Sequence, residues 1–214
     1  MMFETSLTVS IHSNSAQDAF PPACGQHINL LRSEDLETFC ATRADLYIDF
    51  GFEAGESYLS RLKSLQPAVL LVNAVDLTLE EIGLDVARFN GWPGFGFLEM
   101  LELSTKDGQV PQVLEGFAAG CGFTWQVVPD SPGMIRPRII SMIINEAYHT
   151  LHEKISTARE IDTAMKLGTN YPFGPFEWAE RIGVKKVYGL LEKLAKTDSK
   201  YAPSPGLGAA VQSV

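Results

Sequence analysis

Apolar residues gather in short runs along the first two-thirds of the chain, and polar stretches with helical spacing separate them. Four of these runs have the length and β-branched content of strands, at residues 7–11, 27–31, 44–50 and 68–73. The last of these is apolar on both faces, which is typical of a strand covered on both sides of its sheet. Two helices are expected between the strands, at residues 33–42 and 55–65. Strands that alternate with helices predict a mostly parallel α/β sheet.

The pattern changes after a turn rich in proline and glycine at residues 129–133. Before the turn, the spacing predicts one more helix at residues 111–120 and one more strand at 123–128. After the turn, apolar residues recur every three or four positions, which predicts amphipathic helices at residues 138–154, 157–167, 175–182 and 184–194. We therefore expect an α/β domain over residues 1–130 and an all-α domain over residues 131–214.

Small residues mark the expected ends of these helices. Gly168 and Gly183 follow two of the helical segments, and glycine commonly takes the left-handed conformation that ends a helix. The tail at residues 200–214 is rich in proline, glycine, alanine and serine. We expect this tail to run irregularly over the surface or into a partner.

Composition places the chain among globular proteins and removes one class of partner. The chain has 214 residues, of which 45% are apolar, so its side chains can build a packed core. The 17 Lys and Arg against 26 Asp and Glu give a formal charge of −9. This excess of negative charge would repel a polyphosphate backbone, so nucleic acid is not an expected partner.

The sequence also predicts a cytoplasmic protein with free thiols. Cys24, Cys40 and Cys121 are odd in number and widely spaced, which favours reduced cysteines over a disulfide framework. The longest apolar stretches, residues 68–74 and 139–144, are far shorter than the roughly 20 residues that span a bilayer, so no membrane segment is expected. The N-terminus lacks the basic start and long apolar run of a secretory signal.

A long ordered motif in the second part of the chain resembles a known enzyme family. The motif consists of EIDTAMKLG at residues 160–168, YP at 171–172 and GPFE at 174–177. Residues 130–194 as a whole resemble the C-terminal domain of 3-hydroxyacyl-CoA dehydrogenases. The resemblance implies an all-helical domain that packs on a Rossmann-type NAD domain, contributes to an acyl-CoA cleft and forms most of a homodimer interface.

Residues 44–133 are similar to the second half of that family's NAD domain. The segments ADLYIDFGFEAGES, LLVNAVDLTLEEIG, GWPGF, FLEMLELS and WQVVPDSPG follow one another in the family's order. The helical excursion that the family has between its second and third strands is much shorter here. The implied fold is a truncated Rossmann-like, mostly parallel sheet followed by the helical C-terminal domain of the 3-hydroxyacyl-CoA dehydrogenases.

The residues that bind NAD in this family are not matched. A Rossmann site needs the turn G-x-G-x-x-G after its first strand, because only glycine lets the backbone approach the pyrophosphate. Here the first strand leads into IHSNSAQ at residues 11–17, which contains no glycine. Pro21 and Pro22 would also interrupt the helix that normally follows. The sequence therefore predicts no bound cofactor, and NAD is expected only under the alternative that the chain is an active enzyme.

Of the two catalytic residues of this family, the sequence matches only one. The resemblance places the family glutamate at Glu102, the catalytic candidate, and a count of twelve residues back from it gives Asn90 and not the histidine base. An amide does not accept a proton at neutral pH, so Asn90 cannot act as that base. The family's substrate-contacting serine and asparagine fall at Val75 and Pro137. Whether the chain is an enzyme is open at this point.

Three other residues are candidates for contact with an acyl-CoA. The resemblance implies that Asn73 and the aromatic residues Tyr171 and Phe173 border the acyl cleft. The aromatic segment would equally serve as a rigid connection between two helices. Glu146 and His149 have metal-ligand spacing on one helix, but no second histidine motif faces them, so no metal is expected.

These features favour a homologue of 3-hydroxyacyl-CoA dehydrogenases that has lost NAD binding and hydride transfer. It would persist as a homodimer, paired through its helical domain, that binds an acyl-CoA or regulates a β-oxidation enzyme. One alternative is an active 3-hydroxyacyl-CoA or 3-hydroxybutyryl-CoA dehydrogenase of fatty-acid metabolism with a rearranged site. The other is a structural subunit that pairs with a complete dehydrogenase or another pathway enzyme.

Overall fold

The computed structural model describes residues 6–15, 24–95 and 100–213. The chain divides into two compact units, residues 1–131 and residues 132–214. The interruption expected at Pro21 and Pro22 lies outside the described residues. Within the described ranges, no helix combines the length and the hydropathy needed to cross a membrane.

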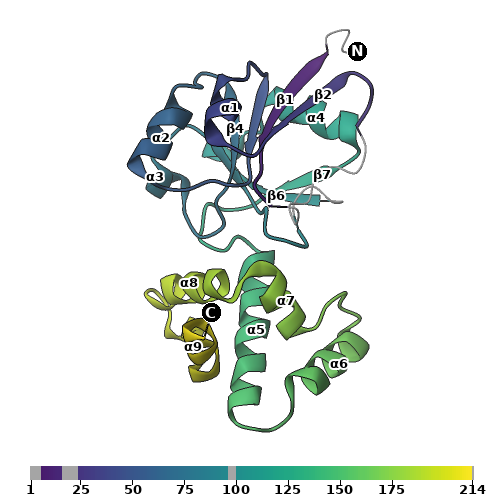
Figure 1. The fold of residues 1–214 in the computed structure, drawn as a ribbon, viewed down its shortest axis with the longest axis vertical. Coiled ribbons are helices and arrows are strands. Elements are labelled where there is room, and N and C mark those ends of the chain that lie inside the picture. The colour runs from purple at the N-terminus through teal and green to yellow at the C-terminus, as the bar shows by residue number, and fades with distance from the viewer. Residues whose placement is uncertain (1–5, 16–23, 96–99, 214) are drawn as a thin grey trace. The chain divides into compact units, whose positions relative to one another are not determined.

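The described part of the first unit is built on a seven-stranded sheet (Figure 1). Its strands are β1 (Leu7–His12), β2 (Ile28–Ser33), β3 (Leu46–Asp49), β4 (Val69–Asn73), β5 (Ala87–Phe89), β6 (Met100–Ser104) and β7 (Thr124–Val127). Their order in space is β2-β1-β3-β4-β5-β6-β7, and every neighbouring pair is parallel except β5 with β6. The mostly parallel sheet and the strands predicted from the apolar runs are confirmed.

Helices cover both faces of this sheet, as Figure 1 shows. They are α1 (Leu36–Ala41), α2 (Glu56–Lys63), α3 (Leu79–Ile82), a short 3-10 turn η1 (Lys106–Gly108) and α4 (Gln112–Cys121). Neighbouring strand residues point to opposite faces. In β3, Tyr47 therefore packs with Phe39 of α1 and Leu62 of α2, whereas Leu46 and Ile48 belong to the cluster under α4.

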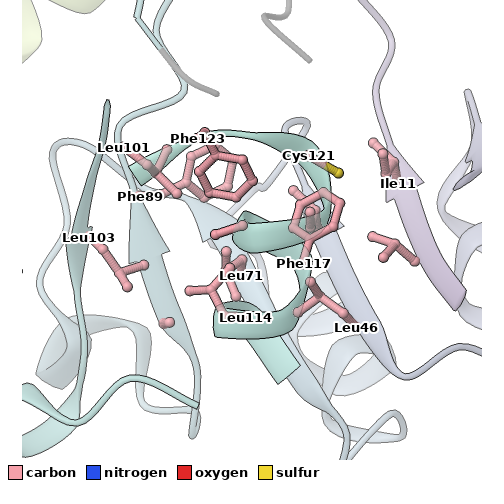
Figure 2. Close-up of a cluster of buried hydrophobic side chains, with 14 of the residues drawn as sticks. Ile11, Leu46, Leu71, Phe89, Leu101, Leu103, Leu114, Phe117, Cys121 and Phe123 are labelled. Carbon is pink, nitrogen blue, oxygen red and sulfur yellow. The ribbon is translucent and has the colours of Figure 1, made fainter. Parts of the chain in front are cut away.

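The cluster under α4 is the larger core of the first unit. Figure 2 shows Leu114 and Phe117 of α4 directed onto side chains of the strands, among them Leu46 and Leu71. All four side chains are completely buried. A fully buried aliphatic or aromatic side chain contributes about 1.5–3 kcal/mol relative to exposure, so this face of the sheet is firmly held.

The second unit is all-helical, as predicted. Its elements are α5 (Arg136–His152), α6 (Ala158–Thr169), α7 (Pro175–Ile182), α8 (Val184–Ala195), the 3-10 turn η2 (Ser199–Tyr201) and α9 (Pro205–Gln212). Gly183 ends α7, as expected from its lack of a Cβ atom. The expected stop at Gly168 is wrong, because α6 continues to Thr169 and Asn170 takes the left-handed conformation that ends it.

The prediction of an irregular tail is wrong as well. The Ser204 hydroxyl accepts a hydrogen bond from the amide of Leu207 at 3.1 Å, and Pro205 occupies the first helical position of α9. The amide of Ser204 in turn donates to the Asn145 side chain at 2.7 Å. Leu207 is completely buried. The composition of the tail hid a serine cap and a proline start, which together favour a helix.

The prediction of three free cysteines is also wrong. Cys24 and Cys121 form a disulfide across a sequence separation of 97 residues, and Cys40 is free. Gly25, just before β2, lies at the C-terminal end of α4, where its amide donates to the carbonyl of Gly120 at 2.8 Å. Wide spacing in the sequence gave no indication that these two cysteines are neighbours in the fold.

Candidate functional site

The carboxyl ends of the parallel strands are where a site is expected in this fold. In open α/β sheets, ligands bind outside these ends, at the point where the strand order reverses. β1 has β2 on one side and β3 on the other, so that point lies between β1 and β3. The last residues of these two strands are His12 and Asp49.

His12, Asp49 and Tyr58 form a buried hydrogen-bonded cluster at this point. Nδ1 of His12 lies 2.7 Å from Oδ1 of Asp49, and the hydroxyl of Tyr58 donates to Oδ2 at 2.7 Å. The Tyr58 oxygen also lies 3.2 Å from the carbonyl oxygen of Gly51. Asp49 is completely buried and His12 is 4% exposed. The cluster thus joins β1, β3 and α2 where the strand order reverses.

The electrostatics of the cluster favour a charged imidazolium beside a neutral phenol. The hydrogen bond to Asp49 raises the pKa of His12, against burial, which lowers it. A hydrogen bond to the backbone of Glu34 raises it further. Burial, followed by the charge of Asp49, raises the pKa of Tyr58, so its hydroxyl remains a neutral donor. Because the chain itself supplies the partners of the imidazole, His12 is poorly suited to act as a general base.

The backbone at Gly51 packs so closely against the ring of His12 that a side chain at position 51 would collide with it. A Cβ atom on Gly51 would lie 2.8 Å from Cε1 of His12. The ring of Phe39 packs on the imidazole with 5.6 Å between ring centroids. The end of β3 and helix α1 therefore enclose the imidazole.

Residues 13–15, the described part of the segment that follows His12, differ from the start of a dinucleotide-binding loop. In such a loop, glycine amides and the N-terminus of a helix face the pyrophosphate. Here the amide of Ser13 donates to the carbonyl of Ser33 at 3.0 Å, so the pairing of β1 with β2 continues past the strand. The Ser13 hydroxyl bonds the carbonyl of Ser15 at 3.2 Å. Residues 13–15 have no helical turn.

Asn73, a predicted substrate contact, lies at the carboxyl end of β4. Its side-chain amide donates to the carbonyl of Phe50 at 3.2 Å, and its side-chain oxygen accepts from the amide of Gly91 at 2.9 Å. A Cβ atom on Gly91 would lie 2.7 Å from Asn73. The side chain therefore fastens the segments that follow β3 and β5, and its role toward substrate remains a prediction.

Glu102, the catalytic candidate, is paired with Asn90. The Asn90 amide donates to Oε2 of Glu102 at 2.9 Å, and the backbone amide of Asn90 donates to the carbonyl of Glu102 at 3.1 Å. The side-chain oxygen of Asn90 accepts from the amide of Trp92 at 3.2 Å. Asn90 is completely buried and Glu102 is 1% exposed. The structure thus brings together the two residues that the count along the sequence had paired.

The aromatic candidates lie in the second unit, in the segment before α7. The edge of the Phe173 ring meets Trp178 with 5.0 Å between centroids, and the guanidinium of Arg181 lies 3.8 Å from its centroid. Tyr171 is 37% exposed. Phe173 is thus engaged by its own unit, and contact of either residue with an acyl-CoA remains a prediction.

No metal centre emerges in the parts of the chain that the structure describes, since no three His, Cys, Asp or Glu residues gather there in a suitable arrangement. The sequence analysis missed the cluster of His12, Asp49 and Tyr58. Its only sequence signal is that His12 and Asp49 each end a strand. Nothing in the spacing pointed to Tyr58.

The fold of this chain is shared with a solved dehydrogenase structure. A Rossmann-like sheet followed by a helical unit also occurs in the crystal structure of (S)-3-hydroxybutyryl-CoA dehydrogenase from Ralstonia eutropha. The TM-score is 0.68 at 22% sequence identity, and the match covers 86% of this chain and 70% of that one. At this level of identity the likeness concerns the fold.

The sequence comparisons then give the family. Residues 133–213 match the C-terminal domain of 3-hydroxyacyl-CoA dehydrogenase. A probable 3-hydroxybutyryl-CoA dehydrogenase of Bacillus subtilis is 37% identical over 149 residues, which cover 64% of this chain and 52% of that protein. A 3-hydroxybutyryl-CoA dehydrogenase of Bradyrhizobium diazoefficiens is 35% identical over 118 residues, 54% of this chain and 40% of that protein. Residues 133–213 of the chain thus carry the C-terminal domain of the 3-hydroxyacyl-CoA dehydrogenase family, and the chain spans about half, or less, of these two relatives.

Proposed function

We propose that this chain is a family member that has lost NAD binding and hydride transfer and acts as a dimeric acyl-CoA-binding or regulatory protein. The observation that carries the proposal is the cluster of His12, Asp49 and Tyr58 at the reversal of strand order. There the chain's own side chains, bonded to one another at 2.7 Å, stand where a dinucleotide would need open backbone amides.

The pairing of Asn90 with Glu102 supports the loss of hydride transfer. Oxidation of a 3-hydroxyl needs a group that takes up its proton, and an amide has no useful affinity for one. Both side chains are buried and bonded to each other at 2.9 Å. Glu102 would then act in holding the β5–β6 hairpin together.

The distribution of charge supports the loss of the cofactor. Residues 1–131 contain 18 Asp and Glu against six Lys and Arg, whereas residues 132–214 contain eight against 11. One of the six cations, Arg88, is completely buried and bonded to Asp130. A pyrophosphate approaching the first unit would meet a field of its own sign.

Exposed apolar side chains of the second unit support pairing between two copies of the chain. Leu167 of α6 is 83% exposed, and Ile155, just before that helix, is 69% exposed. None of the residues of α6 is buried. A twofold axis that placed this helix against a partner would remove these side chains from water.

Isothermal titration calorimetry with NADH, acetoacetyl-CoA and free CoA tests the proposal. We expect acetoacetyl-CoA to bind with a Kd on the order of 10 μM, about −7 kcal/mol, and NADH to give no saturable heat. The Bacillus subtilis relative serves as the positive control for NADH. Saturable NADH binding would contradict the proposal, and failure of both CoA compounds to bind would contradict its acyl-CoA part.

One observation favours the alternative of an active dehydrogenase. Glu102, which the resemblance assigns to the catalytic pair, is buried and bonded to Asn90 at the other position of that pair. This alternative predicts oxidation of NADH that depends on acetoacetyl-CoA and is lost in Glu102→Gln. A rate equal to the background in the wild type would exclude this alternative.

A further inference from the structure

The Cys24–Cys121 disulfide lies where the edge of the sheet meets the helix that covers it. It joins Cys24, which precedes β2, to Cys121, the last residue of α4. The two cysteines are 97 positions apart in the sequence. Beside it, the amide of Gly25 donates to the carbonyl of Gly120 at 2.8 Å. In Figure 2 the sulfur of Cys121 lies at the end of α4, next to the buried side chains that this helix covers. The disulfide therefore fastens the start of an edge strand to α4.

Close packing surrounds this junction. A Cβ atom on Gly25 or on Gly120 would lie 2.8 or 2.9 Å from the ring of His27. Cys121 is only 5% exposed. A hollow of about 460 Å³ lies between the same elements, with Ile28 of β2 and Val113 of α4 in its walls. The position of α4 relative to β2 thus determines both the fit at the junction and the size of the hollow.

The third cysteine of the chain lies outside this junction. Cys40 belongs to α1 and packs with the cluster on the opposite face of the sheet. Burial raises the pKa of its thiol, so it remains protonated and a weak nucleophile. Cys24 and Cys121 are therefore the two cysteines that the fold brings together.

We propose that Cys24 and Cys121 form a redox-sensitive device that locks α4 to the edge strand β2 when oxidised and releases it when reduced. The reductant is a dithiol. Its thiolate attacks one sulfur and breaks the S–S bond, and its second thiol then resolves the mixed disulfide. Two electrons and two protons pass from the dithiol to the protein, which gains two cysteine thiols while the dithiol becomes a disulfide.

The proposal requires a reducing compartment, in which this pair acts as a switch and not as a permanent cross-link. In reducing compartments, disulfides of mesophilic proteins are usually transient, catalytic or redox-sensing. Reduction removes the covalent bond, so that the start of β2 and α4, now 2.8 Å apart at the Gly25–Gly120 hydrogen bond, are free to separate. The inference does not depend on the loss of NAD binding.

The test compares the oxidised full chain with the chain reduced by dithiothreitol. Alkylation in denaturant, counted by mass spectrometry, is expected to modify Cys40 alone in the oxidised form and all three cysteines in the reduced form. Reduction is expected to lower the Tm of the first unit by about 10 °C, since the bond closes a long loop. It is also expected to increase the fluorescence of an apolar dye as the α4 junction loosens.

Variants separate the device from general effects of the reductant. Cys24→Ser and Cys121→Ser are expected to match the reduced wild type with or without dithiothreitol, whereas Cys40→Ser keeps the full response. Equilibration of the wild type in glutathione buffers of increasing reducing strength is expected to convert the pair to thiols within the series. Three alkylated cysteines in the unreduced protein, or a pair that stays oxidised in the most reducing buffer, would overturn the proposal.

Discussion

The two units of this chain differ in how closely they match the 3-hydroxyacyl-CoA dehydrogenase family. The helical unit matches the family over residues 133–213, and all its helices except α9 were predicted from sequence. The sheet unit keeps the strand order of the fold, yet its carboxyl edge is lined by side chains bonded to one another. The charge differs too, with a formal −12 on residues 1–131 and +3 on residues 132–214. Under the proposed function, the fold persists while the residues that serve a ligand change.

The largest expected effect concerns the sheet unit. Arg88 is completely buried, and its guanidinium bonds Asp130 at 2.6 Å and the carbonyls of Ala74 and Ser131 at 3.0 and 2.7 Å. Asp130→Ala leaves this charge without its carboxylate, so we expect the free energy of unfolding of the first unit to fall by about 4 kcal/mol. Urea unfolding followed by tryptophan fluorescence in a Trp178→Phe background reports this unit alone.

Asp85→Ala, at an exposed position, serves as the control for this variant. It is expected to change the free energy of unfolding by less than about 0.5 kcal/mol. An equal effect of both substitutions would show that the ion pair of Arg88 with Asp130 does not hold the unit together.

The next effect belongs to the helical unit. Leu207 of α9 is completely buried, so Leu207→Ala is expected to cost about 3 kcal/mol through lost burial and the cavity it leaves. Leu167→Ala, at a side chain that is 83% exposed, is the matched control and is expected to cost less than about 0.5 kcal/mol in the monomer. Unfolding monitored by the fluorescence of Trp178, in a background with Trp92→Phe and Trp125→Phe, compares them. Similar small effects would mean that α9 is not docked.

A smaller effect is expected at the carboxyl edge of the sheet. Asp49→Asn keeps the size of the side chain but removes the charge that the imidazole of His12 and the hydroxyl of Tyr58 face at 2.7 Å. We expect a loss of about 2 kcal/mol in the first unit. Asp45→Asn is the control, because its Oδ2 accepts from the amide of Thr8 outside the cluster. Equal losses of unfolding free energy in the two variants would show that Asp49 has no special role in the stability of the first unit.

The smallest effect is a dependence on pH. The pKa of His12 is raised in the folded protein above its ordinary value of 6.5, so protonation stabilises the fold. This contribution is complete below pH 6.5 and is lost as the pH rises through the folded pKa. The free energy of unfolding of the first unit is expected to fall over that range. His12→Asn should abolish this slope, and His149→Asn should keep it; a slope that survives in His12→Asn would assign the effect to another group.

The sequence allowed the layers of the fold to be predicted, because strand and helix periodicities are local. It did not allow contacts between distant residues to be predicted. The approach of Cys24 to Cys121, and of Tyr58 to Asp49 and His12, depends on how the connections return across the sheet. The pairing of Asn90 with Glu102 could be predicted, because the family resemblance supplied the spacing.

The most direct test of the central claim is an NMR titration of the isotopically labelled chain with NADH, observing the imidazole of His12 and the amides of Ser13 and Gly51. The account predicts that these resonances stay unchanged at millimolar NADH, because the cluster of His12, Asp49 and Tyr58 occupies the edge where the cofactor would bind. Saturable shifts of these three groups would contradict it and would show that the chain still holds a dinucleotide there.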